Sequence, residues 1–373
     1  MDESKNLKPR ALVCPLNWGL GHASRCIPVI RKLQQSGFDV TAAADGRSLA
    51  LLKEECEDVT FITLPGFSPR FSQGNTLIFR IPVWLVSLAW HTYKEHRALQ
   101  GLVADNKIDL VISDNRFGLF TRKARCVFIT HQVMFKTPRF LRFMEAMLYR
   151  INRFFIQKFD ECWIPDLPGT ENLSGDLSHK YPLPKNACFI GLLSRFQRDK
   201  FSETVADKNI LALLSGPEPQ RSIFEGLILD WLKESNHSAT IVRGTPSETA
   251  GARFPENIRQ FNHMMTGELA LNIRNAGFVI CRSGYSTLMD LAVLGKKPVL
   301  LIPTPGQTEQ EYLARRLSEL GWFNYLAQDK FNPENINRKI RNFSGISLNC
   351  DENLLDGKIS ELLRVLKSYT NSQ

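Results

Sequence analysis

The chain has 373 residues, 43% of them hydrophobic and 23% charged, which is the composition of a folded globular protein and excludes disordered and fibrous classes. At roughly 150 residues per domain, this length predicts two or three domains. The net charge of +9 is almost confined to residues 1–195, where 26 Lys and Arg stand against 18 Asp and Glu (+8), and this predicts an anionic partner for that part of the chain.

Membrane-spanning and secretory segments are not found in the sequence. No apolar run reaches the roughly 18–20 residues that cross a bilayer, and the polar residues 1–10 are followed by no apolar signal segment. The eight cysteines are scattered without a Cys-x-x-Cys pair, so their spacing predicts neither a zinc site nor a disulfide framework. We therefore expect a protein of the reducing cytoplasm.

Short apolar runs alternate with amphipathic stretches along the chain. Before a pause at residues 182–201, the predicted strands are 11–16, 38–43, 59–64, 109–113 and 127–130, and the predicted helices are 22–36 and 48–56. After it, the predicted strands are 209–215, 239–242, 258–261, 278–281 and 298–303, and the predicted helices are 220–234, 286–294, 309–320 and 351–368. Strands separated by helices predict parallel βαβ units, and so an α/β fold in two similar parts.

A glycine-rich turn joins the first predicted strand to the first predicted helix. Gly19 and Gly21 allow a close approach of the backbone to a ligand, and a helix start favours anions. The turn is neither a P-loop nor a dinucleotide fingerprint, because no Gly-Lys-Ser/Thr follows and Ser24 replaces the third glycine. His22 lies at the helix start, where an imidazolium is disfavoured, so it could act as a general base or belong to a structural turn.

Three turns in the second part also follow predicted strands, at the edge where α/β folds bind ligands. In residues 281–290, backbone groups are suited to a diphosphate and Asp290 to the hydroxyls of a ribose. Gly216 and Arg221 are suited to phosphate, although a solvated arginine is equally expected there, and Gln310 and Glu311 are suited to sugar hydroxyls. The candidate residues of the first of these turns are Arg282, Ser283, Gly284, Tyr285, Ser286, Thr287 and Asp290.

These motifs together resemble a GT-B nucleotide-sugar glycosyltransferase. The chain is most similar to glycosyltransferase family 28, which includes the lipid-linked N-acetylglucosaminyltransferase of peptidoglycan synthesis. Its Gly-Leu-Gly-His loop resembles the family's N-terminal glycine-histidine loop, and Arg-Ser-Gly-Tyr-Ser-Thr with Asp290 resembles the donor-binding stretch. Gln310 falls on the family's Gln-Gln pair. The resemblance covers nearly the whole chain in architecture and is most specific in residues 275–321, then in 11–31.

The resemblance implies two Rossmann-like domains that face a cleft. Residues 1–192 would form the acceptor domain and 193–350 the nucleotide-sugar domain, with a C-terminal helix in 351–373 packing back on the first. By position, His22 is implied as the catalytic base and Asp290 as the acid that grips the ribose. Gln310 and Glu311 would lie near the donor sugar, and His263 and Met264 near the uracil.

The implied reaction is an inverting transfer from a UDP-sugar to a hydroxyl of a lipid-linked or other glycan acceptor, without a further cofactor. No Asp-x-Asp metal motif occurs in the chain, so helix N-termini and basic side chains would meet the diphosphate charge. Two departures from the family, Asp290 for its Glu and Glu311 for its second Gln, leave the donor sugar open.

Two other functions stay open at this point. Gly-Leu-Gly-His-Ala-Ser-Arg-Cys also matches the Gly-x-Gly-His-x-x-Arg-Cys loop of the UDP-sugar hydrolases of nonulosonic acid synthesis, which activate water. The other is a non-enzymatic, membrane-bound carbohydrate-binding protein. Asp114 ends a predicted strand and could orient His22 or cap the next turn. His131 ends another predicted strand.

The positive charge is concentrated in residues 122–158, with nine Lys and Arg against one Glu, interleaved with aromatic residues. A basic helix with an aromatic face is typical of a membrane-surface element, and residues 77–90 add an apolar stretch too short to span. We therefore predict peripheral attachment to anionic lipid, on the inner face of the cytoplasmic membrane. A core helix with a solvated basic face is the alternative, and no recognition motif points to nucleic acid.

Overall fold

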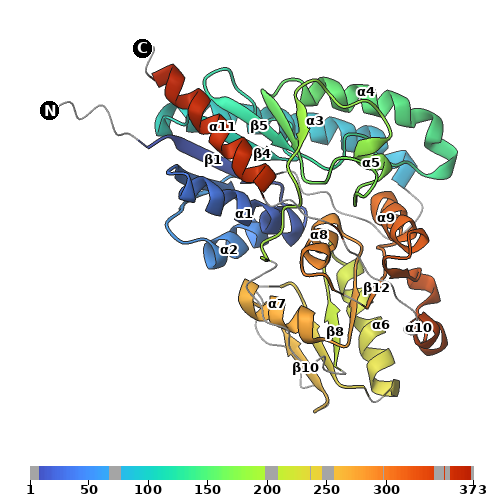
Figure 1. Ribbon diagram of the computed structural model, residues 1–373. Coiled ribbons are helices and arrows are strands. Elements are labelled where there is room, and N and C mark those ends of the chain that lie inside the picture. The colour runs from blue at the N-terminus through green and yellow to red at the C-terminus, as the bar shows by residue number, and fades with distance from the viewer. Residues whose placement is uncertain are drawn as a thin grey trace.

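The computed structural model describes residues 8–66, 77–197, 209–235, 237–245, 256–296, 298–339, 348 and 353–370. It consists of two parallel β-sheets flanked by helices, one above the other in Figure 1. We call the upper part the N-terminal half and the lower part the C-terminal half. The last strand of the upper sheet ends at Phe189 and the first of the lower begins at Ile210, on either side of the predicted boundary.

The sheet of the N-terminal half has the strand order β3-β2-β1-β4-β5-β6-β7, and every neighbouring pair is parallel. Its strands are β1 (Arg10–Pro15), β2 (Asp39–Ala44), β3 (Thr60–Thr63), β4 (Leu110–Asp114), β5 (Arg125–Ile129), β6 (Glu161–Ile164) and β7 (Ala187–Phe189). The direction of strand addition reverses between β1 and β4. In open α/β sheets, the carboxyl ends of such a strand pair form a crevice where ligands bind.

The helices of the N-terminal half cover both faces of this sheet. They are α1 (Leu20–Gln35), α2 (Gly46–Glu55), α3 (Leu77–Asn106), α4 (Glu145–Ile156) and α5 (Asp176–His179), with a 3₁₀ helix at Arg139–Met144. Helix α1 buries Cys26, Ile27, Ile30 and Leu33 on one face, as the spacing predicts. Gly37, with a φ of 88°, closes the helix by donating its N–H to the carbonyl of Gln34.

The sheet of the C-terminal half has the order β10-β9-β8-β11-β12-β13, again with parallel pairs throughout. Its strands are β8 (Ile210–Leu213), β9 (Ala239–Val242), β10 (Ile258–Phe261), β11 (Phe278–Cys281), β12 (Val299–Leu301) and β13 (Asn324–Tyr325). Its helices are α6 (Gln220–Ser235), α7 (Thr266–Asn275), α8 (Tyr285–Val293), α9 (Thr308–Glu319) and α10 (Pro333–Lys339), with a 3₁₀ helix at Gln328–Lys330. Here the reversal lies between β8 and β11.

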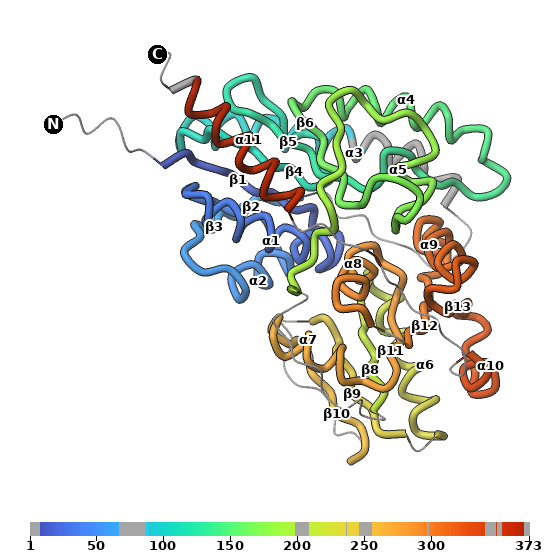
Figure 2. Tube along the Cα trace, viewed as in Figure 1, coloured from blue at the N-terminus to red at the C-terminus, as the bar shows by residue number. Residues whose placement is uncertain are grey.

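The last helix, α11 (Asn353–Thr370), crosses back and packs on α1 of the N-terminal half (Figures 1 and 2). Leu355, Ile359 and Leu362 are buried in the core cluster that contains the apolar face of α1. At the rim of this contact, Lys32 Nζ lies 2.8 Å from Asp356 Oδ2. The N-terminal half therefore takes a helix from the far end of the described chain.

The basic segment 122–158 combines the predicted strand at 127–130 with a helical part. Cys126 to Ile129 are buried in the centre of the sheet as part of β5, because an apolar run of this length fills a strand that is covered on both faces. Only residues 139–156 are helical, as a 3₁₀ turn followed by α4. Two other predicted segments are described only in part. Residues 198–201 of the interruption predicted at 182–201 and residues 351–352 of the last predicted helix lie outside the described residues.

The apolar stretch 77–90 forms the beginning of α3, which has 30 residues. Its side chains are described only at residue 87 and from residue 89 onward, and there Trp90 and Tyr93 are exposed. Within the part of the chain that the structure describes, no helix combines the length and the apolar character needed to cross a bilayer.

Candidate functional site between the two halves

The crevices of the two sheets face each other across the junction between the halves. The turn after β1 leads into α1, and the turn after β11 leads into α8; the two meet where Ser286 Oγ donates a hydrogen bond to the carbonyl of Gly21, at 2.8 Å. A Cβ on Gly21 would lie only 3.0 Å from Ser286 Oγ. Glycine at position 21 thus permits the close approach that brings the two helix starts together.

A cavity of about 120 Å³ opens at this junction and is lined by both halves. Gly19 and Gly21 come from the N-terminal half, and residues from the C-terminal half complete it. The predicted site residues that line it are Gly19, Gly21, Gly216, His263, Ser286, Thr287 and Asp290. Ligand pockets usually measure roughly 300–1,000 Å³, so this cavity is smaller than one that encloses a drug-sized ligand.

His22 and Asp114 meet at this crevice, one in the first turn of α1 and the other at the end of β4. The Nδ1 atom of His22 lies 3.1 Å from Asp114 Oδ1. Arg25, one helical turn beyond His22, places Nε 2.7 Å from Asp114 Oδ2 and also bonds Oδ1, which makes a bidentate ion pair. Asp114 and Arg25 are both buried.

The ion pair decides the charge of Asp114. Burial by itself raises the pKa of this carboxyl, but the charge and hydrogen bonds of Arg25, together with those of His22, hold the pKa well below its usual range. Asp114 is therefore a carboxylate at neutral pH. It can accept the Nδ1 hydrogen of His22, which leaves Nε2 of the same ring able to take up a proton.

A second histidine joins this cluster to the C-terminal half. His131 Nδ1 lies 3.1 Å from Arg25 Nη1, and His131 Nε2 lies 2.7 Å from Oε1 of Glu309, at the start of α9. The ring of His131 stacks on Tyr285 with centroids 3.9 Å apart and planes inclined by 1°. Burial lowers the pKa of His131 despite Glu309, so its imidazole is neutral. Gln132 also bonds Glu309.

Asp290 faces the cavity from the second turn of α8. Burial raises its pKa to about 6, against the charge of Arg195 and a hydrogen bond of 2.6 Å from Ser194 Oγ. Arg195 and Arg47 line the same cavity. Arg195 is itself paired with the buried Glu55 at 3.1 Å, and Glu55 also accepts the N–H of Thr266, so one carboxylate ties α2 to the C-terminal half.

Comparison with known proteins identifies the architecture. Residues 245–349 match the glycosyltransferase family 28 C-terminal domain. An uncharacterized glycosyltransferase of Methanosarcina mazei is 24% identical over 326 residues, which are 82% of each chain. The glycotransferase of kitacinnamycin has a similar structure, with a TM-score of 0.61 over 98% of this chain and 96% of that one, at 13% identity. The chain is a GT-B glycosyltransferase similar to family 28.

A further match covers a shorter part of the chain. The UDP-N-acetylglucosamine–N-acetylmuramyl-(pentapeptide) pyrophosphoryl-undecaprenol N-acetylglucosamine transferase of Desulforudis audaxviator is 42% identical over 85 residues, 22% of this chain and 21% of that one. The predictions of an α/β GT-B fold and of a sugar-transferring enzyme are thus confirmed.

Two arginines that were predicted to contact the diphosphate bind other groups of the glycosyltransferase itself. Arg282 is fully buried and donates to the carbonyls of Ile302, Pro303 and Gln220, while burial lowers its pKa to about 9. Arg221 is buried between Glu218, at 2.6 Å, and Glu225, at 2.9 Å. Neither lines the cavity. Internal acceptors engage both guanidinium groups in this structure, so phosphate contacts by the two arginines stay a prediction.

Four further residues that were predicted to contact the ligand make contacts within the C-terminal half. Met264 is buried in the apolar core and does not line the cavity. Ser283 Oγ donates to the carbonyl of Gln310 at 2.8 Å, and Gln310 Oε1 accepts the N–H of Thr304 at 2.9 Å. Glu311 Oε1 accepts the N–H of Gly306 at 3.0 Å. Ser283, Gln310 and Glu311 thus each stabilise a loop, and the ligand contacts of all four residues stay predictions.

The remaining predicted residues flank the cavity. Gly284 is the N-cap residue of α8, whose first turn carries no acidic side chain. Tyr285 turns its side chain into the junction and donates its hydroxyl to the carbonyl of Pro165 at 2.9 Å. The start of α8 therefore points free backbone N–H groups toward the cleft, a favourable arrangement for an anion.

Four charged residues of the site were not among the predicted site residues: Arg25, Arg47, Arg195 and Glu309. Arg25 had a usable signal, because a residue three positions after His22 lies on the same face of a helix. Glu309 directly precedes Gln310 in the chain. Which of the two side chains points to the N-terminal half depends on the orientation of α9, and the sequence does not indicate that orientation. Arg47 and Arg195 lie outside any motif, so nothing in the sequence indicated their position.

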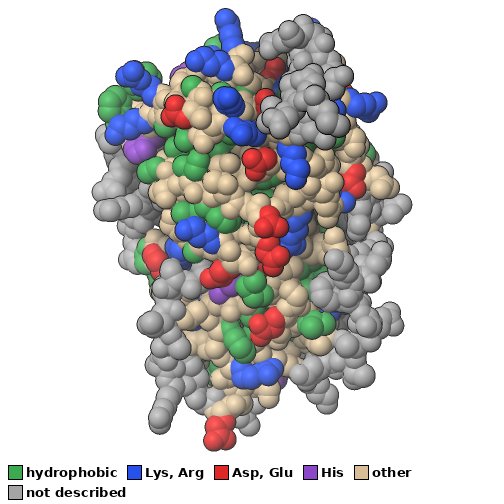
Figure 3. All heavy atoms as spheres, turned by 90° about the vertical axis from the view of Figure 1, so that its left-hand side faces the viewer, with side chains coloured by type: hydrophobic (Ala, Val, Ile, Leu, Met, Phe, Trp, Pro, Cys, Tyr) green, Lys and Arg blue, Asp and Glu red, His purple; other side chains and the backbone are tan. Residues whose placement is uncertain are grey.

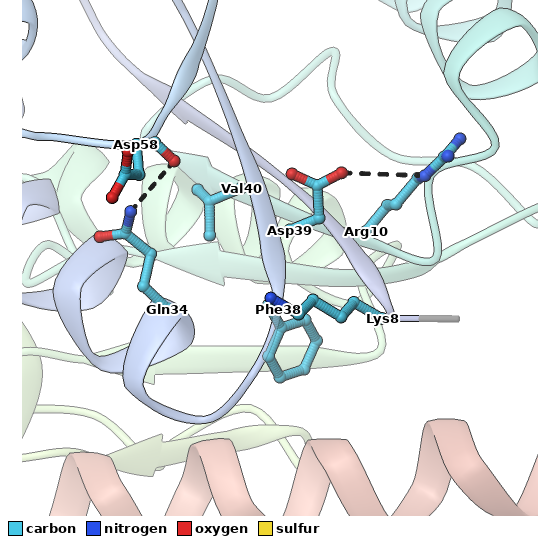
Figure 4. A pocket seen from close by; sticks show the side chains of 7 residues that line it. All are labelled: Lys8, Arg10, Gln34, Phe38, Asp39, Val40 and Asp58. Atoms are coloured by element: carbon cyan, nitrogen blue, oxygen red, sulfur yellow. Dashed lines mark hydrogen bonds and ion pairs between the residues drawn. The ribbon is translucent and has the colours of Figure 1, made fainter. Parts of the chain in front are cut away.

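A larger hollow of about 410 Å³ lies elsewhere, at the amino ends of β1 and β2 (Figure 4). Arg10 and Asp39 form a weak ion pair there, at 3.9 Å, and Gln34 donates to the carbonyl of Asp58 at 3.2 Å. Ligands of parallel α/β sheets bind at the carboxyl ends of the strands. This hollow is at the opposite edge and takes no part in the site.

Proposed function

We propose that this glycosyltransferase is an inverting, metal-independent enzyme that moves a sugar from a UDP-sugar to a hydroxyl of a lipid-linked or other glycan acceptor. The observation that carries the proposal is the His22–Asp114 pair in the crevice of one half, directly opposite the start of α8 in the other. A UDP-sugar is supported by the name of the Desulforudis relative, which is 42% identical to this chain over 85 residues.

In the proposed reaction, His22 Nε2 removes the proton of the acceptor hydroxyl while Asp114 accepts the Nδ1 hydrogen. The acceptor oxygen then forms a bond to the anomeric carbon as the bond from that carbon to the diphosphate oxygen breaks. UDP leaves with the bonding electron pair. Attack from the face opposite the leaving group inverts the anomeric configuration.

The leaving diphosphate carries negative charge that the cleft can meet without a metal ion. The first turn of α8 presents backbone N–H groups, and Arg47 and Arg195 line the same cavity. Preorganised donors of this kind stabilise charge as it develops, because they need not reorient during the reaction.

A UDP-sugar hydrolase is the alternative, and the position of Arg25 favours it. Arg25 belongs to the Gly-x-Gly-His-x-x-Arg-Cys loop and contacts both His22 and Asp114. The same pair could activate a water molecule in place of an alcohol.

The two functions are separated by a ligand screen followed by product analysis. In thermal-shift experiments, UDP and UDP-sugars are expected to stabilise the protein more than other nucleotides do. A ligand at 100 times its Kd raises the free energy of unfolding by about 2.7 kcal/mol. UDP release that depends on an added glycan acceptor supports transfer. Release of free sugar at full rate without an acceptor identifies a hydrolase, and absence of UDP release with every UDP-sugar and acceptor contradicts both.

The raised pKa of Asp290 predicts opposite pH dependences for folding and for UDP binding. An unfolded Asp has a pKa near 3.9, so the folded protein, with Asp290 at about 6, loses stability as the pH rises from about 4 to 6. Over the same range the carboxylate that accepts ribose hydroxyls forms, so UDP affinity is expected to rise. Calorimetry from pH 5 to 7 measures this rise, which Asp290→Asn should abolish; an unchanged slope in that variant would contradict the ribose contact.

We further propose that the surface around α4 attaches the enzyme to anionic membranes on the cytoplasmic side. Phe140, Phe143 and Phe154 are 62%, 79% and 60% exposed. Arg139, Arg142, Arg150, Arg153 and Lys158 accompany them. By contrast, the face in Figure 3, the left-hand side of Figure 1, mixes basic and acidic side chains, whereas α4 lies to the right in Figure 1. Exposed aromatic rings beside cations are typical of a membrane-surface element.

Replacing Phe140, Phe143 and Phe154 together by serine is expected to weaken binding to phosphatidylglycerol-containing vesicles at least about tenfold. Burial of one such ring contributes roughly 1.5–3 kcal/mol, and 1.4 kcal/mol corresponds to a factor of ten. Flotation at low salt is the measurement. Ile223→Ser with Leu320→Ser, which removes exposed apolar side chains of the C-terminal half, should leave binding unchanged. The proposal fails if the wild type does not float with anionic vesicles.

A further inference from the structure

A chain of hydrogen bonds crosses the junction and ends at the proposed base. It runs from Glu309 in the C-terminal half through His131 to Arg25, from Arg25 to Asp114, and from Asp114 to His22. The contacts measure 2.7 Å between Glu309 and His131, 3.1 Å between His131 and Arg25, 2.7 Å between Arg25 and Asp114, and 3.1 Å between Asp114 and His22. Four of these five residues lie in the N-terminal half, and only Glu309 reaches in from the other.

The direction of every hydrogen in the crossing part of the chain is determined. A guanidinium only donates, so Nδ1 of His131 must accept from Arg25. A neutral imidazole then carries its single hydrogen on Nε2, which donates to the carboxylate of Glu309. Both ring nitrogens of His131 are thus engaged, one by each half of the enzyme.

The C-terminal half also contacts the flat face of the His131 ring. Tyr285 lies parallel to it, and the hydroxyl of Tyr285 is anchored on Pro165. The ring therefore contacts the first turn of α8 and the first turn of α9, the helix starts that border the cleft. When the halves separate, both contacts are lost together.

We propose that His131 is a positioning residue that couples closure of the C-terminal half to alignment of the His22–Asp114 pair, acting through Arg25. This inference rests on the proposed function, since it takes His22 as the base. Arg25 holds both oxygens of Asp114 and contacts His22, so a shift of its guanidinium would move both members of the pair. The carboxylate of Glu309 and the amide of Gln132 complete the surroundings of the ring.

Three substitutions of His131 test the coupling, because each keeps a different part of the contact. Asparagine places an oxygen near Nδ1 and can accept from Arg25, glutamine places an amide near Nε2 and can donate to Glu309, and phenylalanine keeps only the stack on Tyr285. Coupling needs both nitrogens, so all three are expected to lower kcat about 10–100-fold, the scale of a misplaced reactive group. The KM for the UDP-sugar is expected to change by less than about threefold, because the donor contacts remain.

A matched control is His96→Phe, which replaces a histidine whose ring packs at a tilt against Phe120 and bonds the carbonyl of Gly118, away from the cleft. It is expected to keep the wild-type kcat. Glu309→Gln combined with His131→Phe should be no slower than the slower single variant, because both changes interrupt one chain. Multiplicative losses, or a wild-type kcat in His131→Phe, would overturn the inference while leaving the base assignment to His22 intact.

Hydrogen exchange gives a readout that does not depend on turnover. Glu309→Gln, in the C-terminal half, is expected to raise amide exchange in residues 20–27 of the other half, because Arg25 loses its fixed position. Unchanged exchange there would contradict the coupling even if the protein released no UDP. Failure of the proposed function alone would instead appear as a fully active His22→Asn variant.

Discussion

Replacement of His22 by asparagine is expected to lower kcat/KM for sugar transfer by about 10²–10⁴-fold, the usual contribution of a general base. Asparagine can still bond Asp114, so the local structure and the affinity for UDP should remain. What is lost is the ring nitrogen that takes up the acceptor proton. Steady-state kinetics combined with calorimetric UDP titration separate these two effects.

The control for this variant is His237→Asn, which changes an exposed histidine of the C-terminal half that lies outside the cavity. It should retain wild-type kinetics. A His22→Asn enzyme with near wild-type transfer would show that another group, or none, removes the proton.

The substitution Asp114→Asn is expected to affect stability and activity together. Loss of the carboxylate leaves the Arg25 guanidinium buried without its charge partner, and breaking a buried ion pair in this way costs about 3–5 kcal/mol of unfolding free energy. Activity should fall at least about 10²-fold, because the amide can present its N–H group to His22 and so favour the wrong ring tautomer. Urea denaturation and steady-state kinetics measure the two losses.

A double variant separates the effect on stability from the effect on activity. Removing both charges in Arg25→Met/Asp114→Leu replaces the buried pair by apolar side chains and is expected to recover stability without recovering activity. Asp39→Asn serves as the control, since its ion pair with Arg10 is exposed and such pairs contribute at most about 1 kcal/mol. A stable, fully active Asp114→Asn enzyme would exclude the orienting role.

The sequence predicted the strands and the place of the site for the same physical reason. Runs such as Phe278–Cys281 and Val299–Leu301 are apolar throughout because a parallel sheet covered on both faces buries them completely. Polar and glycine residues directly after such runs, among them His22, Asp114 and Ser286, must lie at the carboxyl edge. The edge could thus be predicted without knowing how the two sheets are arranged.

The partners of the charged residues could not be predicted in this way. Arg282 was assigned to a diphosphate by its residue type and neighbours, but three carbonyls from two separate turns surround it once β12 and α6 are in place. Likewise, the contact between His131 and Glu309 joins residues 178 positions apart and depends on the orientation of one half against the other. The local sequence pattern contains no information on the partners of Arg282 or on the contact between His131 and Glu309.

The return of α11 to the N-terminal half bears on how the protein is made. Leu355, Ile359 and Leu362 complete a core that begins with α1, so this half cannot close its hydrophobic interior until the ribosome has translated residues 353–370. During synthesis, the apolar face of α1 stays open while the whole C-terminal half emerges. Domains generally fold in order from the N-terminus; here the half translated first receives its last helix only after all strands of the other half have been translated.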